Sequence, residues 1–270
     1  MRLLWGLAVF AMPAWAQSPP VPPPRDPTPR HVTLPLESRT LGETRVINIY
    51  TPPGYDSSGA ASFPVVYMPD GGLAEDFPHI ANTLDSLIAL RAIGPVILVG
   101  IENTERRRDL TGPTAVGTDS AIARRVGGSA EFRRFLRDEL MPMIRARYRS
   151  TEETTIVGES LAALFIVETF LLEPGLFRRY IALSPSLWWN GGALLRAAPA
   201  RLRELTDLPR ILYLTAATEP GIAAETAALA AILGAHAPAG LRWWYEPRPD
   251  LEHGTIFRMA VPAAFVRVLR

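Results

Sequence analysis

From about residue 60 to its end, the chain alternates short apolar runs with amphipathic segments. Runs rich in β-branched or aromatic residues, which predict strands, occur at 64–68, 95–99, 155–157, 179–183, 210–215 and 241–246. The run at 95–99 is continuously apolar, as expected for a strand buried on both faces. Alternating strands and helices predict an α/β fold with a mostly parallel central sheet and helices on both faces.

Three further segments complete this prediction. Residues 32–37 and 44–51 read as an antiparallel β pair at the amino-terminal side of the sheet. Helical spacing over 129–147 predicts a long amphipathic helix, which Pro142 is expected to kink. A last helix is expected from about residue 257 to 269.

The strand at 155–157 leads straight into the sequence Gly158-Glu159-Ser160 and then into an apolar, alanine-rich helical segment. A strand–turn–helix with the pattern G-x-S-x-G is typical of a nucleophile elbow, in which a sharp turn exposes the serine hydroxyl above the sheet. Here Ala162 replaces the last glycine. The alternative is an ordinary strand end whose serine caps the helix.

A serine nucleophile needs a base, and the chain has four histidines, at 31, 79, 236 and 253. In α/β-hydrolases the order along the chain is serine, acid, histidine, so the first two are unsuitable. His236 lies between a helix and the last strand, whereas His253 lies in the polar loop that follows that strand. We therefore expect His253 to be the base, against the alternative of a solvated loop histidine.

The acid is expected in the loop after the strand at 210–215, where Glu219 is the natural candidate. Glu225, Asp250 and Glu252 are alternatives, and a Ser–His pair without an acid also stays open. A neutral histidine must accept the serine proton, so activity is expected to rise with pH near about 6.5 or somewhat above.

Two backbone N–H groups are expected to bind the oxyanion. One belongs to Leu161, which follows the nucleophile, and the other to the loop after the strand at 64–68. Gly72 is the expected donor in that loop, with Gly71 as the alternative. A plain Asp-Gly turn is the alternative reading of the same residues.

The chain resembles the putative-esterase group of α/β-hydrolases, which includes the enterochelin and salmochelin esterases and, more distantly, esterase D and the mycolyltransferases. The stretches that carry the resemblance are 65–72, 99–104, 108–111, 158–165, 184–189 and 252–254. It implies the roles given above for Ser160, His253, Leu161 and Gly72. The chain departs from the group's pattern at Ala162 and at Gly112, where a proline is usual.

Side chains after two strand ends bear on specificity. Arg106 and Arg108 follow a strand end and could hold a carboxylate, catecholate or phosphate; the alternative is an ion-paired loop. Trp188 and Trp189 could form an aromatic wall beside the serine, or could pack under their loop.

The first residues predict where the protein works. A positive start, an apolar run and Ala14-Trp15-Ala16 predict a signal peptide over 1–16 and a periplasmic or secreted protein. Residues 17–30 are Pro-rich and predict a disordered leader before a hydrolase domain at 31–270. The alternative is an uncleaved anchor, although the apolar run is short for a membrane span.

Composition narrows the choice of ligand and partner. The net charge of +1 predicts no nucleic-acid partner and no special attraction to an anionic membrane. No stretch after the signal peptide is long and apolar enough to be a membrane span, so no stable membrane insertion is expected after its cleavage. The chain has no cysteine, and its histidines lack ligand spacing, so neither a metal nor a cofactor is expected. The oligomeric state stays open.

These observations predict an exported serine esterase that hydrolyses a small-molecule carboxylic ester, such as a siderophore lactone, through an acyl-enzyme. Acyl transfer to an alcohol and a catalytically inactive binding protein on the same fold are the alternatives.

Overall fold

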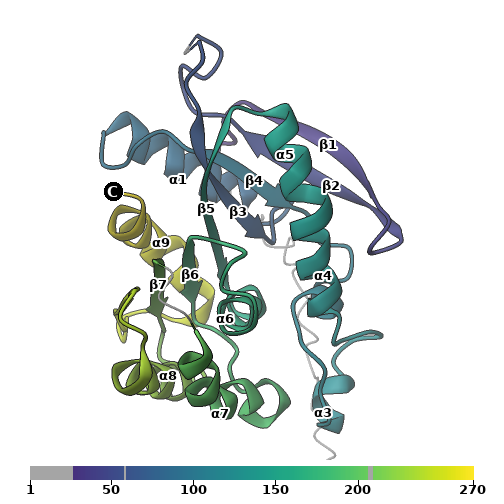
Figure 1. Ribbon diagram of the computed structural model, residues 1–270, viewed down its shortest axis with the longest axis vertical. Helices are drawn as coiled ribbons and strands as arrows, with labels where there is room; N and C mark the ends of the chain where they lie inside the picture. The colour runs from purple at the N-terminus through teal and green to yellow at the C-terminus, as the bar shows by residue number, and fades with distance from the viewer. Residues whose placement is uncertain (1–26, 58, 206–208) are drawn as a thin grey trace, which may run out of the picture.

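The computed structural model describes residues 27–57, 59–205 and 209–270. These residues form a sheet with the strand order β1-β2-β4-β3-β5-β6-β7-β8, in which β1, β2 and β4 pair antiparallel and all other neighbours pair parallel (Figure 1). The strands are β1 (His31–Ser38), β2 (Glu43–Tyr50), β3 (Phe63–Pro69), β4 (Ile97–Ile101), β5 (Ser150–Glu159), β6 (Arg179–Leu183), β7 (Arg210–Thr215) and β8 (Leu241–Tyr245). The predicted α/β fold with an antiparallel amino-terminal pair is confirmed.

Helices cover both faces of this sheet. They are α1 (Phe77–Ala89), α2 (Arg106–Asp109), α3 (Gly117–Ser120), α4 (Ser129–Phe135), the π-helical turn η1 (Leu136–Leu140), α5 (Met141–Arg147), α6 (Leu161–Leu172), α7 (Trp189–Glu204), α8 (Ala223–His236) and α9 (His253–Leu269). The side chains of α1 and α9 belong to one hydrophobic core, and those of α4 to α8 belong to another, on the opposite face of the sheet.

The central strands supply both cores because successive side chains point to opposite faces. In β3, Val65 and Tyr67 join the core under α4 to α8, whereas Val66 and Met68 join the core under α1 and α9. All four are at most 1% exposed. Burial on both faces explains why these strands read as continuous apolar runs.

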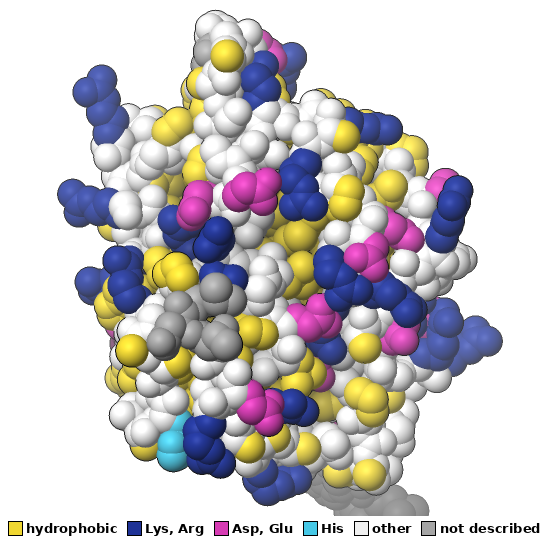
Figure 2. Space-filling view, in the orientation of Figure 1, with side chains coloured by type: hydrophobic (Ala, Val, Ile, Leu, Met, Phe, Trp, Pro, Cys, Tyr) yellow, Lys and Arg dark blue, Asp and Glu magenta, His cyan; other side chains and the backbone are white. Residues whose placement is uncertain are grey.

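The predicted signal peptide at 1–16 and residues 17–26 of the predicted leader at 17–30 lie outside the described residues, and residues 27–30 precede β1 without regular structure. Within the described part of the chain, no helix has the length and apolarity needed to cross a membrane. Arginine and acidic side chains are interspersed over the face shown in Figure 2, in keeping with the net charge of +1.

Two helix predictions need correction. The helix expected at 129–147 is present, but a π-helical turn interrupts it where a proline kink was expected. Pro142 lies in the first turn of α5, and the π turn directly precedes it, so the irregular stretch comes before the missing N–H. The last helix begins at His253 rather than near residue 257, because Glu252 and Thr255 form a capping box at its start.

The strand order reverses between β3 and β5, since β4 lies on one side of β3 and β5 on the other. In open α/β sheets the crevice outside the carboxyl ends of the strands at such a reversal is the usual ligand site. The residues that follow these two strands, Asp70 and Ser160, both have positive φ, at 56° and 62°. The topology therefore predicts a ligand site at this edge of the sheet.

The loop after β3 leans directly on β4. Gly71 N donates to Ile101 O at 2.9 Å, and the buried Asn48 donates through Nδ2 to Gly71 O, also at 2.9 Å. A Cβ on Gly71 would lie 2.3 Å from Ile101 N and 2.4 Å from Gly100 Cα, both of them backbone atoms. Only glycine permits this approach.

We predict that Gly71→Ala destabilises the protein by about 3 kcal/mol or more, since no side-chain movement can relieve a clash with backbone. The measurement is the free energy of unfolding in urea. Gly94→Ala is the matched control, because a Cβ there has no neighbour within 4 Å. Equal stability of the two variants would contradict the packing described.

Candidate active site

Ser160 stands at the turn between β5 and α6 with φ 62° and ψ −118°, a conformation that non-glycine residues rarely adopt. The helix packs so closely against the strand that a Cβ on Gly158 would lie 2.6 Å from the Cβ of Ala162. The absence of a side chain at Gly158 thus makes room for the methyl group that replaces the usual elbow glycine. The Ser160 side chain makes no capping bond to α6, which argues against the helix-cap alternative.

His253 meets this serine from the other side of the crevice. Its Nε2 lies 3.0 Å from Ser160 Oγ, a normal hydrogen-bond distance. The sequence placed His253 in a loop, but it is the first residue of α9. The start of the helix therefore fixes its backbone. The arrangement is that of a nucleophile with its general base.

Glu219 lies in the loop after β7, as expected, and its Oε1 accepts the backbone N–H of His253. Its Oε2 and the Nδ1 of His253 are both buried, and neither has a hydrogen-bonding partner within the described residues. The negative charge of Glu219 raises the pKa of His253 against the lowering effect of burial. Glu219 therefore binds the first backbone N–H of α9, and its negative charge favours the protonated form of the histidine.

Glu159, the middle residue of the elbow motif, also faces the base. Its Oε1 lies 3.0 Å from His253 Nε2, but this oxygen forms no hydrogen bond with any described residue. Burial raises the pKa of Glu159 to about 8; Arg106 opposes the shift, and the nearby carboxylates of Asp70 and Asp76 add to it. At neutral pH the carboxyl group is mostly protonated, so it adds little negative charge beside the base.

The two expected oxyanion donors differ in whether their N–H groups are already hydrogen-bonded. Leu161 N is at the first position of α6, where helix geometry supplies no acceptor, and it donates to no other group of the described residues, so it is available to bind an oxyanion. Gly72 N donates to Glu75 Oε2 at 2.7 Å, and the alternative donor, Gly71 N, is used by Ile101 O. Gly72 can act as a second donor only after the Glu75 carboxylate leaves it.

Arg106 lies at the crevice and forms an ion pair with Asp70 in the loop after β3. Its Nε and Nη2 donate to the two oxygens of Asp70 at 2.6 and 2.8 Å, and Asn103 Nδ2 donates to Asp70 Oδ1 at 2.6 Å. The Arg106 side chain is 35% exposed, which leaves part of the guanidinium open. Its positive charge lowers the pKa of both His253 and Glu159.

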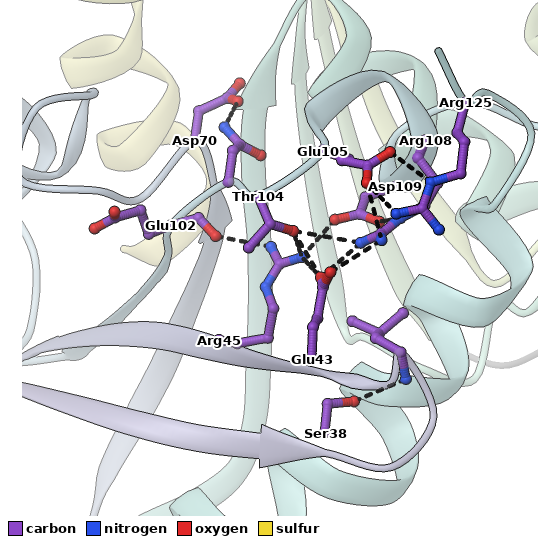
Figure 3. A network of polar contacts seen from close by, with 12 residues as sticks. Ser38, Glu43, Arg45, Asp70, Glu102, Thr104, Glu105, Arg108, Asp109 and Arg125 are labelled. Atoms are coloured by element: carbon purple, nitrogen blue, oxygen red, sulfur yellow. Dashed lines mark hydrogen bonds and ion pairs between the residues drawn. The ribbon is translucent and has the colours of Figure 1, made fainter. Parts of the chain in front are cut away.

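Arg108 points elsewhere, although it is only two residues from Arg106. Figure 3 shows its guanidinium among Glu43, Asp109 and Thr104, with Arg45 on the far side of the same carboxylates. Hydrogen bonds from Arg108 hold the pKa of Glu43 at about 2. The geometry favours the ion-paired alternative for this residue over substrate contact.

The two tryptophans also differ. Trp189 is 4% exposed and donates through Nε1 to Gly112 O at 2.8 Å, so it packs under the loop. Trp188 is 38% exposed. Of the pair, only Trp188 keeps the surface needed for an aromatic wall.

Burial lowers the pKa of His253 below its usual value, and Arg106 lowers it further. The expectation from the sequence that activity rises at about pH 6.5 or above therefore needs correction: the imidazole is neutral, and able to accept a proton, from somewhat lower pH.

Among the described residues, no group of three or more histidines and carboxylates is arranged to hold a metal ion.

A mostly parallel sheet with a strained serine turn after a central strand, and a histidine after the last strand, defines the α/β-hydrolase class. The family model described as "Putative esterase" matches residues 38–210, and the chain belongs to this family.

Individual relatives agree with this assignment. Ferri-bacillibactin esterase BesA of Bacillus subtilis is 29% identical over 174 residues, which are 57% of this chain and 58% of BesA. The siderophore triacetylfusarinine C esterase of Aspergillus fumigatus is 29% identical over 171 residues, 59% of this chain and 57% of that protein. The crystal structure of an IroE-like serine hydrolase from Shewanella oneidensis superposes with a TM-score of 0.76 and 29% identity, covering 88% of this chain and 78% of that one. The chain spans less than two thirds of the length of these two curated relatives.

Three residues of the site were not singled out from the sequence: Glu159, Glu75 and Ser186. Ser186 Oγ lies 3.4 Å from Ser160 Oγ. A usable signal existed for two of them, because Ser186 follows the strand next to β5 and Glu159 adjoins the nucleophile. Residues at the carboxyl ends of neighbouring parallel strands lie close together.

We predict that Glu159→Gln becomes progressively more stable than the parent protein as pH rises from about 5 to 8, and that the difference then levels off. The folded protein holds the pKa of Glu159 at about 8, above its value of 4.5 in an unfolded chain. The parent therefore loses stability over this interval, whereas glutamine has no proton to lose. The measurement is the free energy of unfolding of both proteins in urea at pH 5, 7 and 9. Glu152→Gln, at an exposed position of β5, should show no such trend.

Proposed function

We propose that the protein is an exported serine esterase that hydrolyses carboxylic esters through an acyl-enzyme. The observation that carries the proposal is the strained Ser160, with Oγ 3.0 Å from His253 Nε2. The export part rests on the sequence of residues 1–16, which lie outside the described part of the chain.

In the proposed reaction, Ser160 Oγ attacks the ester carbonyl while its proton moves to His253 Nε2. The charge that develops on the carbonyl oxygen is bound by Leu161 N–H and, once Glu75 has turned away, by Gly72 N–H. His253 then protonates the leaving alcohol, and water, activated by the same base, releases the acid. Glu219 stabilises the imidazolium through its charge.

The substrate is proposed to be a siderophore ester. The support is the similarity to BesA and to the triacetylfusarinine C esterase, whose names state such substrates. Arg106 and Trp188 are the proposed substrate contacts, since both keep exposed surface. A screen of ester hydrolysis over acyl chains of graded length, with a trilactone siderophore included, tests this class against simple esters.

We expect Ser160→Ala to lower ester hydrolysis by about a thousandfold or more, because it removes the attacking atom. We also expect an organophosphonate to modify the parent protein at Ser160, and peptide mass spectrometry locates the adduct. A folded Ser160→Ala protein that keeps most of its activity would falsify the assignment. If a phosphonate-reactive protein passes its acyl group mainly to added alcohol, it is an acyltransferase.

Glu219→Gln is expected to lower kcat by at least about tenfold and to move the acidic limb of the pH–rate profile to lower pH. The parent limb should lie below the usual histidine value, because burial lowers the pKa of His253. Removing the carboxylate charge, which raises that pKa, lowers it further. The readout is kcat/KM against pH.

Glu225→Gln is the matched control, since Glu225 also has a buried Oε2 that finds no hydrogen-bonding partner among the described residues. It should stay within about twofold of the parent. Near-parental rates and an unmoved limb in Glu219→Gln would mean that the reaction uses Ser160 and His253 alone.

A further inference from the structure

The loop after β6 is fixed directly onto the nucleophile turn. Ser186 N donates to Ser160 O at 3.2 Å, and Ser184 N donates to Thr215 O at 2.8 Å. Ser184 has φ 46°, and its Oγ accepts Ala217 N at 3.1 Å. The loop therefore bridges the carboxyl ends of β5 and β7, and it holds Ser186 beside Ser160.

Ser186 is 2% exposed, so its hydroxyl is cut off from bulk water. Within the described residues, the single hydrogen-bonding partner of this hydroxyl is Ser160 Oγ, at 3.4 Å. That distance is long for a bond between two hydroxyls, which usually lies between about 2.5 and 3.0 Å. A buried hydroxyl with one weak partner needs an explanation, because such groups are normally well satisfied.

The direction of this contact follows from the neighbouring one. Ser160 has a single hydroxyl proton, and His253 Nε2, 3.0 Å away, accepts it in the neutral tautomer that carries its proton on Nδ1, which is the form a general base needs. Ser160 Oγ can then only accept from Ser186, so the Ser186 proton is directed at the attacking oxygen. Hydrogen bonds to an ionised oxygen are shorter and stronger than those between neutral groups.

We propose that Ser186 is a further catalytic residue, whose hydroxyl donates to Ser160 Oγ and stabilises the negative charge that develops there. The inference rests on the proposed function. As His253 removes the Ser160 proton, the Oγ–carbonyl bond forms and the carbonyl electron pair moves to the oxyanion; Ser186 keeps its own proton throughout. When water later breaks the acyl-enzyme, the same donor stabilises Oγ as it leaves, before His253 returns the proton.

The loop has other anchors that should survive removal of this hydroxyl. Leu187 is fully buried, and Trp189 is held by its bond to Gly112 O. The backbone bond from Ser186 N also needs no side chain. Ser186→Ala is therefore expected to fold.

The experiment measures the rate at which an organophosphonate modifies Ser160, a single step that needs no deacylation. We expect Ser186→Ala to slow this rate by about tenfold to a hundredfold, as befits the loss of a hydrogen bond to a charged atom. KM for an ester substrate and the melting temperature should be unchanged. Ser129→Ala is the matched control, because Ser129 is 1% exposed, its hydroxyl has no partner within the described residues, and it lies next to Thr111 and Gly112 rather than in hydrogen-bond contact with Ser160.

Ser186→Cys supplies a second variant of similar size with a weak donor, and an intermediate rate is expected. It also replaces Ser186→Ala in the comparison if that variant proves unstable. Parental modification rates in either folded variant would overturn the role of Ser186 and leave the proposed function intact. A parent protein that the phosphonate does not modify would overturn both.

Discussion

The strained turn at Ser160 is the feature on which the rest of the site depends. A residue held at φ 62° and ψ −118° costs about 1–3 kcal/mol, and the turn persists only because its surroundings fix it. Helix α6 supplies that fixation, since ten of its twelve residues are buried. Each large apolar side chain among them contributes about 1.5–3 kcal/mol on burial, so the packing of this one helix outweighs the strain. The hydroxyl points toward His253 above the sheet because the packed helix fixes the turn.

The neighbouring strands use the same device. Asp70 after β3 and Ser184 after β6 also have positive φ, and side-chain hydrogen bonds hold each of these turns to another part of the chain. Arg106 and Asn103 hold the carboxylate of Asp70, while Ser184 Oγ binds the backbone after β7. The ends of three adjacent strands, β3, β5 and β6, thus each continue into a turn of positive φ that contacts with other parts of the chain stabilise.

The sequence pattern predicted the strands, the helices and the mostly parallel sheet better than it predicted the directions of the side chains. Ser160 and His253, whose side chains meet in the structure, could be paired from the sequence because a strand–turn–helix pattern and chain order constrain them. Arg106 and Arg108 could not be distinguished, since both follow the same strand end. They lie in one short helix, α2, where residues two apart do not face each other, so one reaches Asp70 and the other Glu43. Similarly, the occupation of Gly72 N–H by Glu75 depends on where a loop carboxylate turns, which no spacing rule states.

The balance of charge around His253 follows from these placements. Burial and the guanidinium of Arg106 favour the neutral imidazole, whereas Glu219 favours the charged one. Glu159, whose Oε1 lies 3.0 Å from Nε2, would favour the charged form of the imidazole strongly if it were ionised, but its own burial keeps it mostly protonated at neutral pH. In the proposed reaction, these opposing effects leave the imidazole of the resting protein able to accept the serine proton, and the negative charge of Glu219 then stabilises the imidazolium. Above pH 8, when Glu159 ionises, a second negative charge faces the base, and the imidazolium becomes easier to form and slower to give its proton to the leaving group.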